Sequence, residues 1–303
     1  MEKKDIIEHF AYNRPESIGI YGYGSGVFKQ ETRTERKDIP QTDIIFIVDD
    51  LRKWHQENME INQQDYSLMG KVHFNMKSVA RIKGKNNITY LSNIYERGFY
   101  FKYGVVELTD FLRGLGEWDN IFVAGRFHKP VLEIKSNEDI RKSIDYNRNC
   151  ALMVACLFCD VFTTVTEIYR RIVSLSYVGD ARMMFAENPN KVSNIVNGSF
   201  DKFISTYPLN EDYISIMENG MVYINHDRIL ERKNELPVSL VKFLNDMGTD
   251  YSCLDIVRIN IGTFLIFKNS QESKNQIVEG IKTNGIVRSV PYALSKVKKR
   301  VLN

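Results

Sequence analysis

Long apolar runs are absent from this sequence of 303 residues. The longest, Cys150–Cys159, reaches about half of the roughly 20 residues that a membrane span needs, and Asp160 ends it. We interpret it as a core helix. Residues 1–10 hold several acids and no apolar core of a signal sequence, so neither a secretory signal nor an arginine-rich transit peptide is predicted. A cytosolic, bacterial protein is therefore expected.

Cysteine and histidine are scarce, with 4 and 5 residues respectively. Cys156 and Cys159 have the Cys-x-x-Cys spacing of a metal site, and Cys150 lies nearby, but there is no second pair and no neighbouring histidine. The surrounding residues include Leu, Met, Val and Phe. Buried thiols in a reducing compartment are therefore the better interpretation.

The sequence also lacks a large excess of one charge. Its 41 basic and 38 acidic residues leave a net charge of +3, so no broad basic surface for a nucleic acid is predicted. A hydrophobic content of 43% in a chain of this length is enough for buried cores in two modest domains.

What the sequence does contain is a glycine-rich turn followed by an acid-led strand. The turn, Tyr23–Phe28, follows a short apolar strand, Ile18–Tyr21, and the strand Asp43–Asp50 comes after a polar loop. Glycines let backbone N–H groups approach phosphate oxygens, and Ser25 adds a hydroxyl donor. A carboxylate at Asp43 would hold Mg²⁺, which bridges phosphate oxygens. Together they predict a nucleotide-handling site.

This turn is neither of the common phosphate loops, because it lacks the Gly-Lys-Ser/Thr ending of a P-loop and no helix signal follows it. Its order of turn, loop and Asp-led strand resembles the nucleotidyltransferase fold of the DNA polymerase β type. Further stretches, in order along the chain, resemble the mitochondrial-type CDP-diacylglycerol synthases, also called translocator assembly and maintenance proteins. These stretches are Gly22–Phe28, Asp43–Phe46, Trp54–His55 with Asn58 and Asn62, Asp65–Ser67, Lys102–Val106, Ala124–Val131, Leu175–Tyr177, Gly179–Asp180, Arg182–Met183, Asn188–Pro189, Lys191–Val192 and Gly285–Ser289.

The resemblance implies a phosphatidate cytidylyltransferase of phospholipid biosynthesis, which uses Mg²⁺ to join CTP to phosphatidic acid and releases pyrophosphate. It implies Asp43 as the metal ligand, and Asp43 and Ser25 as catalytic residues. Basic groups would balance the charge of the triphosphate, and His128 is expected to donate a hydrogen bond rather than to bind metal. The residues implied to bind the nucleotide are Tyr23, Gly24, Ser25, Gly26, Lys102, Arg126, His128, Lys129, Asp180, Arg182 and Lys191.

A second metal ligand is missing from its usual place. The common nucleotidyltransferase pattern has another carboxylate two residues on, on the same strand face, where this chain has Ile45. Asp49 lies roughly 20 Å further along the strand. With Asp50, it is expected to cap the helix that follows. By position, the remaining candidates are Glu107 and Asp110.

The helix after the acid-led strand is predicted to be structural. Trp54 and Asn58 lie on one helix face and are expected to pack against the sheet. His55 is not needed as a base, because phosphatidate already carries a nucleophilic phosphate oxygen at neutral pH. The same structural interpretation applies to Asn62 and to Asp65–Ser67.

Alternating strand-like and helical runs predict an α/β (α+β) chain. We expect a nucleotidyltransferase domain over 1–136, a helical, winged-helix-like domain over 137–230 and a C-terminal region over 231–303. The predicted strands are Ile18–Tyr21, Ile44–Val48, Val72–Val79, Thr89–Ile94, Phe99–Val106 and Thr263–Phe267. The predicted helical stretches are Leu51–Asn62, Leu108–Leu115, Ala151–Ile172, Asp180–Phe203 and Ser239–Asp246.

The C-terminal region is predicted to end in a basic amphipathic helix that starts at Pro291. Val290, Leu294, Val297 and Val301 recur at helical steps. Such a helix binds an anionic bilayer mainly by electrostatics, which predicts a peripheral protein on the inner face of the membrane. A solvated or frayed helix is the alternative. The basic residues of this tail are Lys296, Lys298, Lys299 and Arg300.

Two other functions stay open at this point. In the first, the chain is a nucleotidyltransferase of the same fold that acts on a protein or on a nucleic acid end. In the other, the chain is a non-catalytic, membrane-associated assembly factor with a degenerate site, as the Ile at position 45 suggests. Fold alone does not decide between them.

Overall fold

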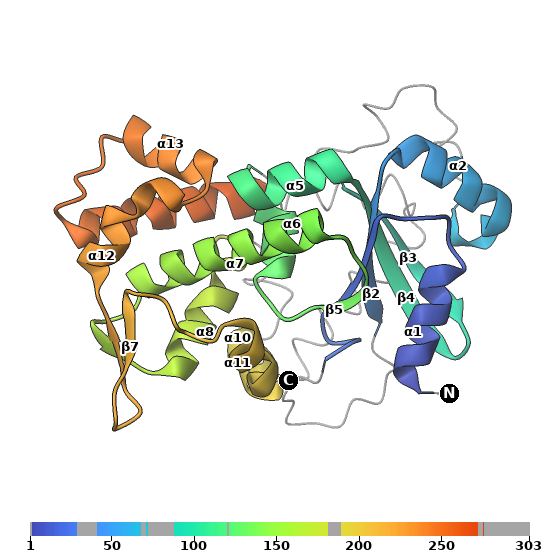
Figure 1. The fold of residues 1–303 in the computed structure, drawn as a ribbon. Coiled ribbons are helices and arrows are strands. Elements are labelled where there is room, and N and C mark those ends of the chain that lie inside the picture. Colours follow the sequence, from blue (N-terminus) through green and yellow to red (C-terminus); the bar gives the residue numbers. More distant parts are fainter. Residues whose placement is uncertain are drawn as a thin grey trace.

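The structure is a computed structural model that describes residues 2–28, 41–67, 71, 88–119, 121–180, 189–271 and 275. Within these residues a five-stranded sheet lies beside a mainly helical body (Figure 1). The predicted mixed α/β class is confirmed. The predicted strand Val72–Val79, Arg182 and the basic tail beyond Pro291 lie outside the described residues.

The sheet has the strand order β3-β4-β2-β1-β5. β2 and β4 are parallel, and the other neighbouring pairs are antiparallel. Four predicted strands are confirmed to within a few residues, whereas β5 was not predicted. The strands are β1 (Gly19–Tyr23), β2 (Thr42–Val48), β3 (Ile88–Glu96), β4 (Phe99–Glu107) and β5 (Leu132–Lys135).

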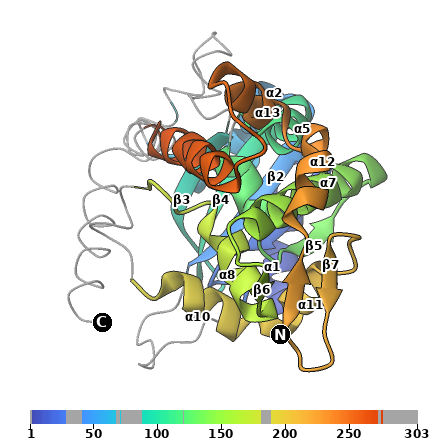
Figure 2. The same cartoon turned by 90° about the vertical axis from the view of Figure 1, so that its left-hand side faces the viewer.

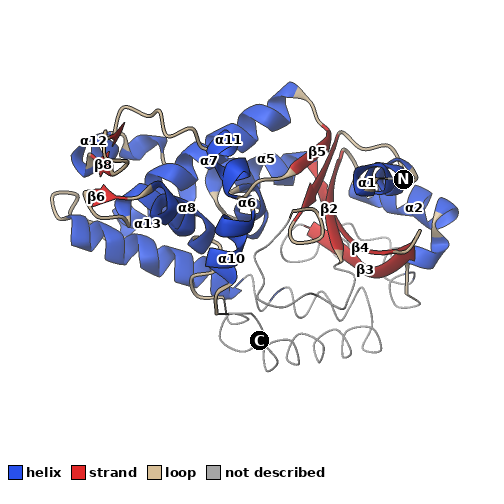
Figure 3. Cartoon of the chain, turned by 90° about the horizontal axis from the view of Figure 1, so that it is seen from below, coloured by secondary structure: helices blue, strands red, loops and turns tan. Residues whose placement is uncertain are grey.

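Both faces of this sheet are covered at its centre, so β2 carries an uninterrupted apolar run from Ile44 to Val48. Side chains alternate along β2: Ile44 and Phe46 pack with α1 and α2, whereas Ile45 and Ile47 pack with α5, α6 and α7 (Glu138–Leu157). Figure 3 shows α1 and α2 on one side of the strands and the helical body on the other. The helices against the sheet, with a short 3-10 turn, are α1 (Lys3–Tyr12), α2 (Leu51–Ile61), η1 (Gln63–Asp65), α5 (Leu108–Glu117) and α6 (Ile121–Phe127).

The predicted helix after the acid-led strand is confirmed, together with its cap. The Asp50 carboxylate accepts a hydrogen bond from the backbone N–H of Lys53 at 2.9 Å. This bond satisfies one of the N–H groups that a helix start leaves unpaired.

The helical body shares one hydrophobic cluster, which runs from Trp118 to Leu265 along the chain. The cluster contains residues on both sides of the expected boundaries at 136 and 230. Figure 2 shows this body with α13 at the top and the hairpin of β7 lower down. Its elements are α7 (Glu138–Leu157), β6 (Phe162–Thr163), α8 (Val165–Ser174), α10 (Lys191–Gly198), α11 (Phe200–Thr206), β7 (Ile214–Ile216), β8 (Val222–Ile224), α12 (His226–Glu231), η2 (Lys233–Glu235) and α13 (Val238–Asp246), followed by a helix over 254–271.

The apolar cysteine-containing run is a core helix end, as predicted. Cys150, Cys156 and Cys159 are buried free thiols, and burial raises the pKa of each, to about 12 for Cys150 and about 11 for Cys159. Across the described residues, no helix is both long enough and apolar enough to cross a bilayer.

The predicted strand Thr263–Phe267 is wrong, because these residues belong to the helix over 254–271. Val257, Ile261, Phe264 and Leu265 are all buried, and their spacing of four, three and one is helical. The short apolar run at 263–267 favoured a strand locally, but the helical spacing of apolar residues over the longer segment determines its structure. The small antiparallel sheet of β6, β8 and β7 was not predicted either.

Candidate functional site

Asp43 lies at the start of β2, next to the glycine turn. In the register of the sheet it stands opposite Tyr23 of β1 and Lys102 of β4. It shares its strand face with Ile45 and so points toward the helical body. The Asp43 side chain is partly exposed. The position fits the predicted association of turn and acid.

Two glycines determine the shape of the turn. Gly24 has φ +75°, and a Cβ at this position would lie 3.3 Å from Asp43 Oδ2. A Cβ on Gly26 would lie 2.3 Å from the Gln41 carbonyl oxygen, so only glycine fits against the start of β2. The Gly24 carbonyl accepts hydrogen bonds from the N–H groups of Val27 and Phe28. Ser25 is partly exposed at the tip of this turn.

Three basic residues gather near this turn, and we call Arg126, Lys129 and Lys191 the cation cluster. The Arg126 guanidinium lies 5.6 Å from the ring centre of Tyr23 and 4.1 Å from that of Phe122. The Lys129 and Lys191 ammonium groups lie 5.2 Å and 5.3 Å from the ring centre of Tyr177. The cluster thus joins α6, the 175–180 loop and the start of α10.

Two members of the cation cluster, Arg126 and Lys129, are largely buried. Within the described residues, neither Arg126 nor Lys129 has a carboxylate within ion-pair distance. The Arg126 Nε is buried without a hydrogen-bond partner there. Burial, then Arg126 and Lys191, lower the pKa of Lys129 well below its usual value. Such a group of cations favours an anion.

Lys102 extends this basic region over the sheet. Its ammonium lies 4.5 Å from the ring centre of Tyr90, whose hydroxyl is 3.4 Å from that of Tyr23. Burial raises the pKa of Tyr23, and Tyr90 and Asp43 raise it further. The Tyr23 phenol is therefore a neutral hydrogen-bond donor opposite Asp43.

His128 lies elsewhere, in the core. Its ring is 5.1 Å from that of Trp118, and its Nε2 is 3.2 Å from Asn147 Oδ1. Burial lowers the pKa of His128 to about 3, so the ring is neutral. Arg126 and Lys129 are three residues apart on one side of the helix end, whereas His128 turns inward. The structure therefore does not bring His128 to the cation cluster.

The candidates for a second metal ligand are wrong. In the parallel pairing of β2 and β4, Asp43 stands opposite Lys102, whereas Glu107 stands opposite Val48 at the other end of the strand. Five residues of strand separate the two ends by roughly 17 Å. Asp110 follows Glu107 in α5 and pairs with Arg113 at 2.9 Å. The described residues contain no group of three or more His, Cys, Asp or Glu placed to hold a metal.

Asp180 belongs to the same loop as Tyr177, and its N–H donates to the Tyr177 carbonyl oxygen at 3.1 Å. It is buried. Asp180 thus contacts Tyr177 through the backbone and Lys191 contacts it through the ring, while Arg182 lies outside the described residues. No sequence pattern predicted Tyr90, Ser176 or Tyr177 as a site residue. Leu175–Tyr177 was one of the stretches that carried the family resemblance, and this was the available signal.

The opposite face of the sheet holds a buried polar network, as the structural interpretation of the Trp54 helix predicted. Arg14 and Asp65 form a fully buried ion pair at 3.1 Å. Tyr103 donates to Asp65 Oδ2 at 2.9 Å, and Asn58 donates to the Tyr103 hydroxyl at 2.8 Å. The Tyr66 hydroxyl lies 2.9 Å from His55 Nδ1. These residues hold α2 and η1 to the sheet.

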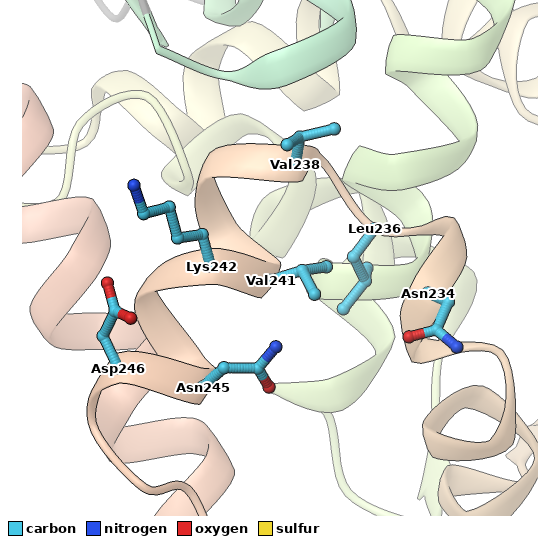
Figure 4. Close-up of a pocket in the computed structure, with 7 residues that line it drawn as sticks. All are labelled: Asn234, Leu236, Val238, Val241, Lys242, Asn245 and Asp246. Atoms are coloured by element: carbon cyan, nitrogen blue, oxygen red, sulfur yellow. The ribbon is translucent and has the colours of Figure 1, made fainter.

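A separate pocket of about 370 Å³ lies along α13 (Figure 4). In Figure 4 its apolar side chains lie between Asn234 and the polar end of α13. It shares no residue with the cation cluster and so is not part of the candidate site. Its lining is Asn234, Leu236, Val238, Val241, Lys242, Asn245 and Asp246.

Comparison with known proteins connects this geometry to one family. A family model described as "Phosphatidate cytidylyltransferase, mitochondrial" matches residues 4–234. A protein of that name from Schizosaccharomyces pombe is 33% identical over 328 residues, covering 96% of this chain and 82% of the relative. The Rattus norvegicus protein is 28% identical over 337 residues, covering 97% and 93%.

The Dictyostelium discoideum protein of the same name is 34% identical over 227 residues, which cover 66% of this chain and 53% of the relative. The matched region includes the glycine turn, Asp43 and the cation cluster. The chain belongs to the family of mitochondrial-type phosphatidate cytidylyltransferases.

Proposed function

We propose that this chain transfers a cytidylyl group from CTP to phosphatidic acid, giving CDP-diacylglycerol and pyrophosphate. The observation that carries the proposal is the convergence of Asp43, the glycine turn and the cation cluster on one side of the sheet. Family membership supplies the substrates. We also propose that the sheet and its helices form a polymerase β-like nucleotidyltransferase domain.

Asp43 is the residue that would hold Mg²⁺. A single carboxylate fits this ion because Mg²⁺ commonly takes one or two carboxylates and completes its shell with substrate phosphates and water. The cation is therefore expected to arrive with CTP rather than to stay in the free protein. When bound, it would offset the charge that develops on the phosphate oxygens.

The remaining groups position the triphosphate. The partly exposed Ser25 and the backbone N–H groups of the turn donate to phosphate oxygens, and the cation cluster offsets the charge of the departing pyrophosphate. The phosphate of the lipid attacks the α-phosphorus of CTP, the bond to the β-phosphate oxygen breaks, and pyrophosphate leaves. Catalysis rests on positioning and charge balance, so no protein base is required.

The lipid substrate places the reaction at a membrane. We propose that the basic tail, with Lys296, Lys298, Lys299 and Arg300, contacts an anionic bilayer. Removing 291–303 should weaken turnover on vesicles far more than turnover on detergent-dispersed lipid. Equal losses on both would assign the tail a structural role.

The proposal is tested by pyrophosphate release from the purified chain with Mg²⁺, CTP and phosphatidic acid vesicles. Reactions with ATP, GTP and UTP, and one without lipid, are run beside it. Release that needs both CTP and the lipid is expected, with CDP-diacylglycerol as the lipid product. Chelation of Mg²⁺ should stop it.

The outcomes also separate the alternatives. Release with CTP that needs a protein or an oligonucleotide instead of lipid would indicate another acceptor. A folded chain that releases no pyrophosphate with any nucleotide would be better described as a non-catalytic membrane factor.

A further inference from the structure

The Lys129 ammonium is held by three fixed contacts. Its Nζ donates to the Gly125 carbonyl oxygen at 2.5 Å and to Ser176 Oγ at 2.7 Å, and it lies over the ring of Tyr177. The Ser176 hydroxyl in turn donates to the Val173 carbonyl oxygen at 3.2 Å, which leaves its lone pairs for Lys129. An ammonium has three N–H donors, so one remains for a ligand.

The Tyr177 ring is the element that the two lysines share. Lys129 and Lys191 lie at nearly equal distances from its centre, 5.2 Å and 5.3 Å, although 62 positions separate them in the chain (191 − 129). Two ammonium groups repel each other, and the negative face of an aromatic ring reduces the cost of placing them close together. Tyr177 therefore has a role that an aliphatic side chain does not fill, because it depends on the aromatic ring.

The loop that carries Tyr177 is itself fixed from two sides. Asn269, in the helix over 254–271, donates to the carbonyl oxygens of Leu175 at 2.9 Å and Val178 at 2.7 Å. On the other side, a Cβ on Gly125 of α6 would lie 2.6 Å from Ser176 Cβ, so the helix and the loop are in close contact. The position of the ring is thus set before any ligand binds.

We infer that Tyr177 is a positioning residue, whose ring holds Lys129 and Lys191 together so that both ammonium groups bind the polyphosphate of the nucleotide. This inference rests on the proposed function. Tyr177 acts through the lysines and need not touch the reacting atoms. Preorganised cations bind a phosphate chain more tightly, because little side-chain freedom is lost on binding.

The test is binding of inorganic tripolyphosphate to the full chain, measured by titration calorimetry. Tyr177→Leu is expected to weaken binding about tenfold, because it removes two cation–ring contacts. Tyr177→Phe keeps the ring and should bind within about twofold of the wild type. The matched control is Tyr251→Leu, which removes a Lys233–ring contact of 4.2 Å outside the candidate site and should leave binding unchanged.

A double-mutant cycle separates positioning from a general structural effect. If Tyr177 acts through Lys129, the losses from Tyr177→Leu and Lys129→Met are not additive. Additive losses, wild-type binding by Tyr177→Leu, or a Tyr177→Phe variant as weak as Tyr177→Leu would each overturn the inference. If Tyr177→Leu does not fold, Ser176→Ala tests the same restraint on Lys129, and unchanged binding would then overturn it.

The probe contains neither cytosine nor lipid, so the two proposals can fail separately. If the variants bind tripolyphosphate as expected but the chain does not turn over CTP, only the proposed function is refuted. If Tyr177→Leu turns over CTP and binds tripolyphosphate like the wild type, only the positioning role of Tyr177 is refuted.

Discussion

On one face of the five-stranded sheet, Arg14 is fully buried and bonded to Asp65 and Glu96. On the other face, Arg126 and Lys129 are packed against rings and backbone, with no carboxylate at ion-pair distance in the described residues. The first arrangement balances its charge within the chain. In the second, the described residues supply no carboxylate at that distance, and an anion with several negative oxygens suits the group.

This difference shows how buried charge distinguishes structural from binding residues. The Arg14 network is complete, with Tyr103 and Asn58 continuing it, so a ligand has nothing to add. The cation cluster has an Arg126 Nε without a partner in the described residues and beside it the partly exposed Asp43. Mutations on the two faces should therefore separate stability from activity.

The largest effect on activity is expected at Asp43. Asp43→Asn keeps the shape of the side chain but removes the charge that would hold Mg²⁺, so turnover should fall by about a thousandfold or more. Initial rates of CTP-dependent pyrophosphate release measure this loss. Asp49→Asn, an exposed position on the same strand face, is the control and should stay near wild type. Comparable rates for Asp43→Asn and the wild type would refute the metal assignment.

The largest effect on stability is expected on the opposite face. Arg14→Met keeps contact with Phe10, over which the guanidinium lies at 3.5 Å, but it leaves Asp65 buried without its cation. The free energy of unfolding in urea should fall by about 3 kcal/mol. Arg141→Met breaks an exposed ion pair with Glu133, and solvent screening means that the free energy of unfolding should change little. Equal decreases in the free energy of unfolding for the two variants would show that the buried ion pair stabilises the fold no more than the exposed one.

Local patterns predicted four strands of the five-stranded sheet, the α2 cap and the position of Asp43 next to the glycine turn, because each depends on neighbouring residues. They failed where a partner is distant. Glu107 was proposed as a metal ligand because it follows Lys102, yet only the parallel register of β2 and β4 shows that it lies at the other end. His128 was predicted to bind the nucleotide because it belongs to the Ala124–Val131 stretch of the family resemblance, but the end of α6 places it in the core.

Tyr177 and Ser176 are the opposite case, because they belong to the candidate site but were not predicted. Ser176 and Lys129 are 47 positions apart, and their contact depends on how the 175–180 loop packs against α6. No periodicity in the sequence contains that information. The five-stranded sheet order was also beyond reach, because strand pairing is set by tertiary packing rather than by the pattern of one strand.

At Lys129 we expect a smaller effect, in which anion binding is weakened but stability is nearly unchanged. This again distinguishes its face of the sheet from the face that holds Arg14. Lys129→Met removes a buried cation that has no carboxylate partner in the described residues, so relief of desolvation should offset much of the lost hydrogen bonding. The free energy of unfolding should change by less than about 1 kcal/mol, while tripolyphosphate binding weakens by about 10- to 100-fold. Lys233→Met, which removes a cation packed on Tyr251, is the control for binding. A loss of stability like that of Arg14→Met would place Lys129 among the structural residues.

The smallest effect is a proton taken up when the anion binds. In the free chain the pKa of Lys129 lies well below its usual value of 10.5, and a bound polyphosphate should raise it, because the opposite charge favours the ammonium. Only the protonated form of Lys129 binds the anion well. The affinity should therefore fall as pH rises through the pKa of Lys129 in the free chain. Above that pKa, binding of the anion should be accompanied by uptake of a fraction of a proton. Calorimetry over a series of pH values, each in two buffers of different ionisation enthalpy, measures this fraction. It should disappear in Lys129→Met, which also controls for protons taken up by the ligand itself; the same uptake in both proteins would mean that Lys129 is already charged before the anion arrives.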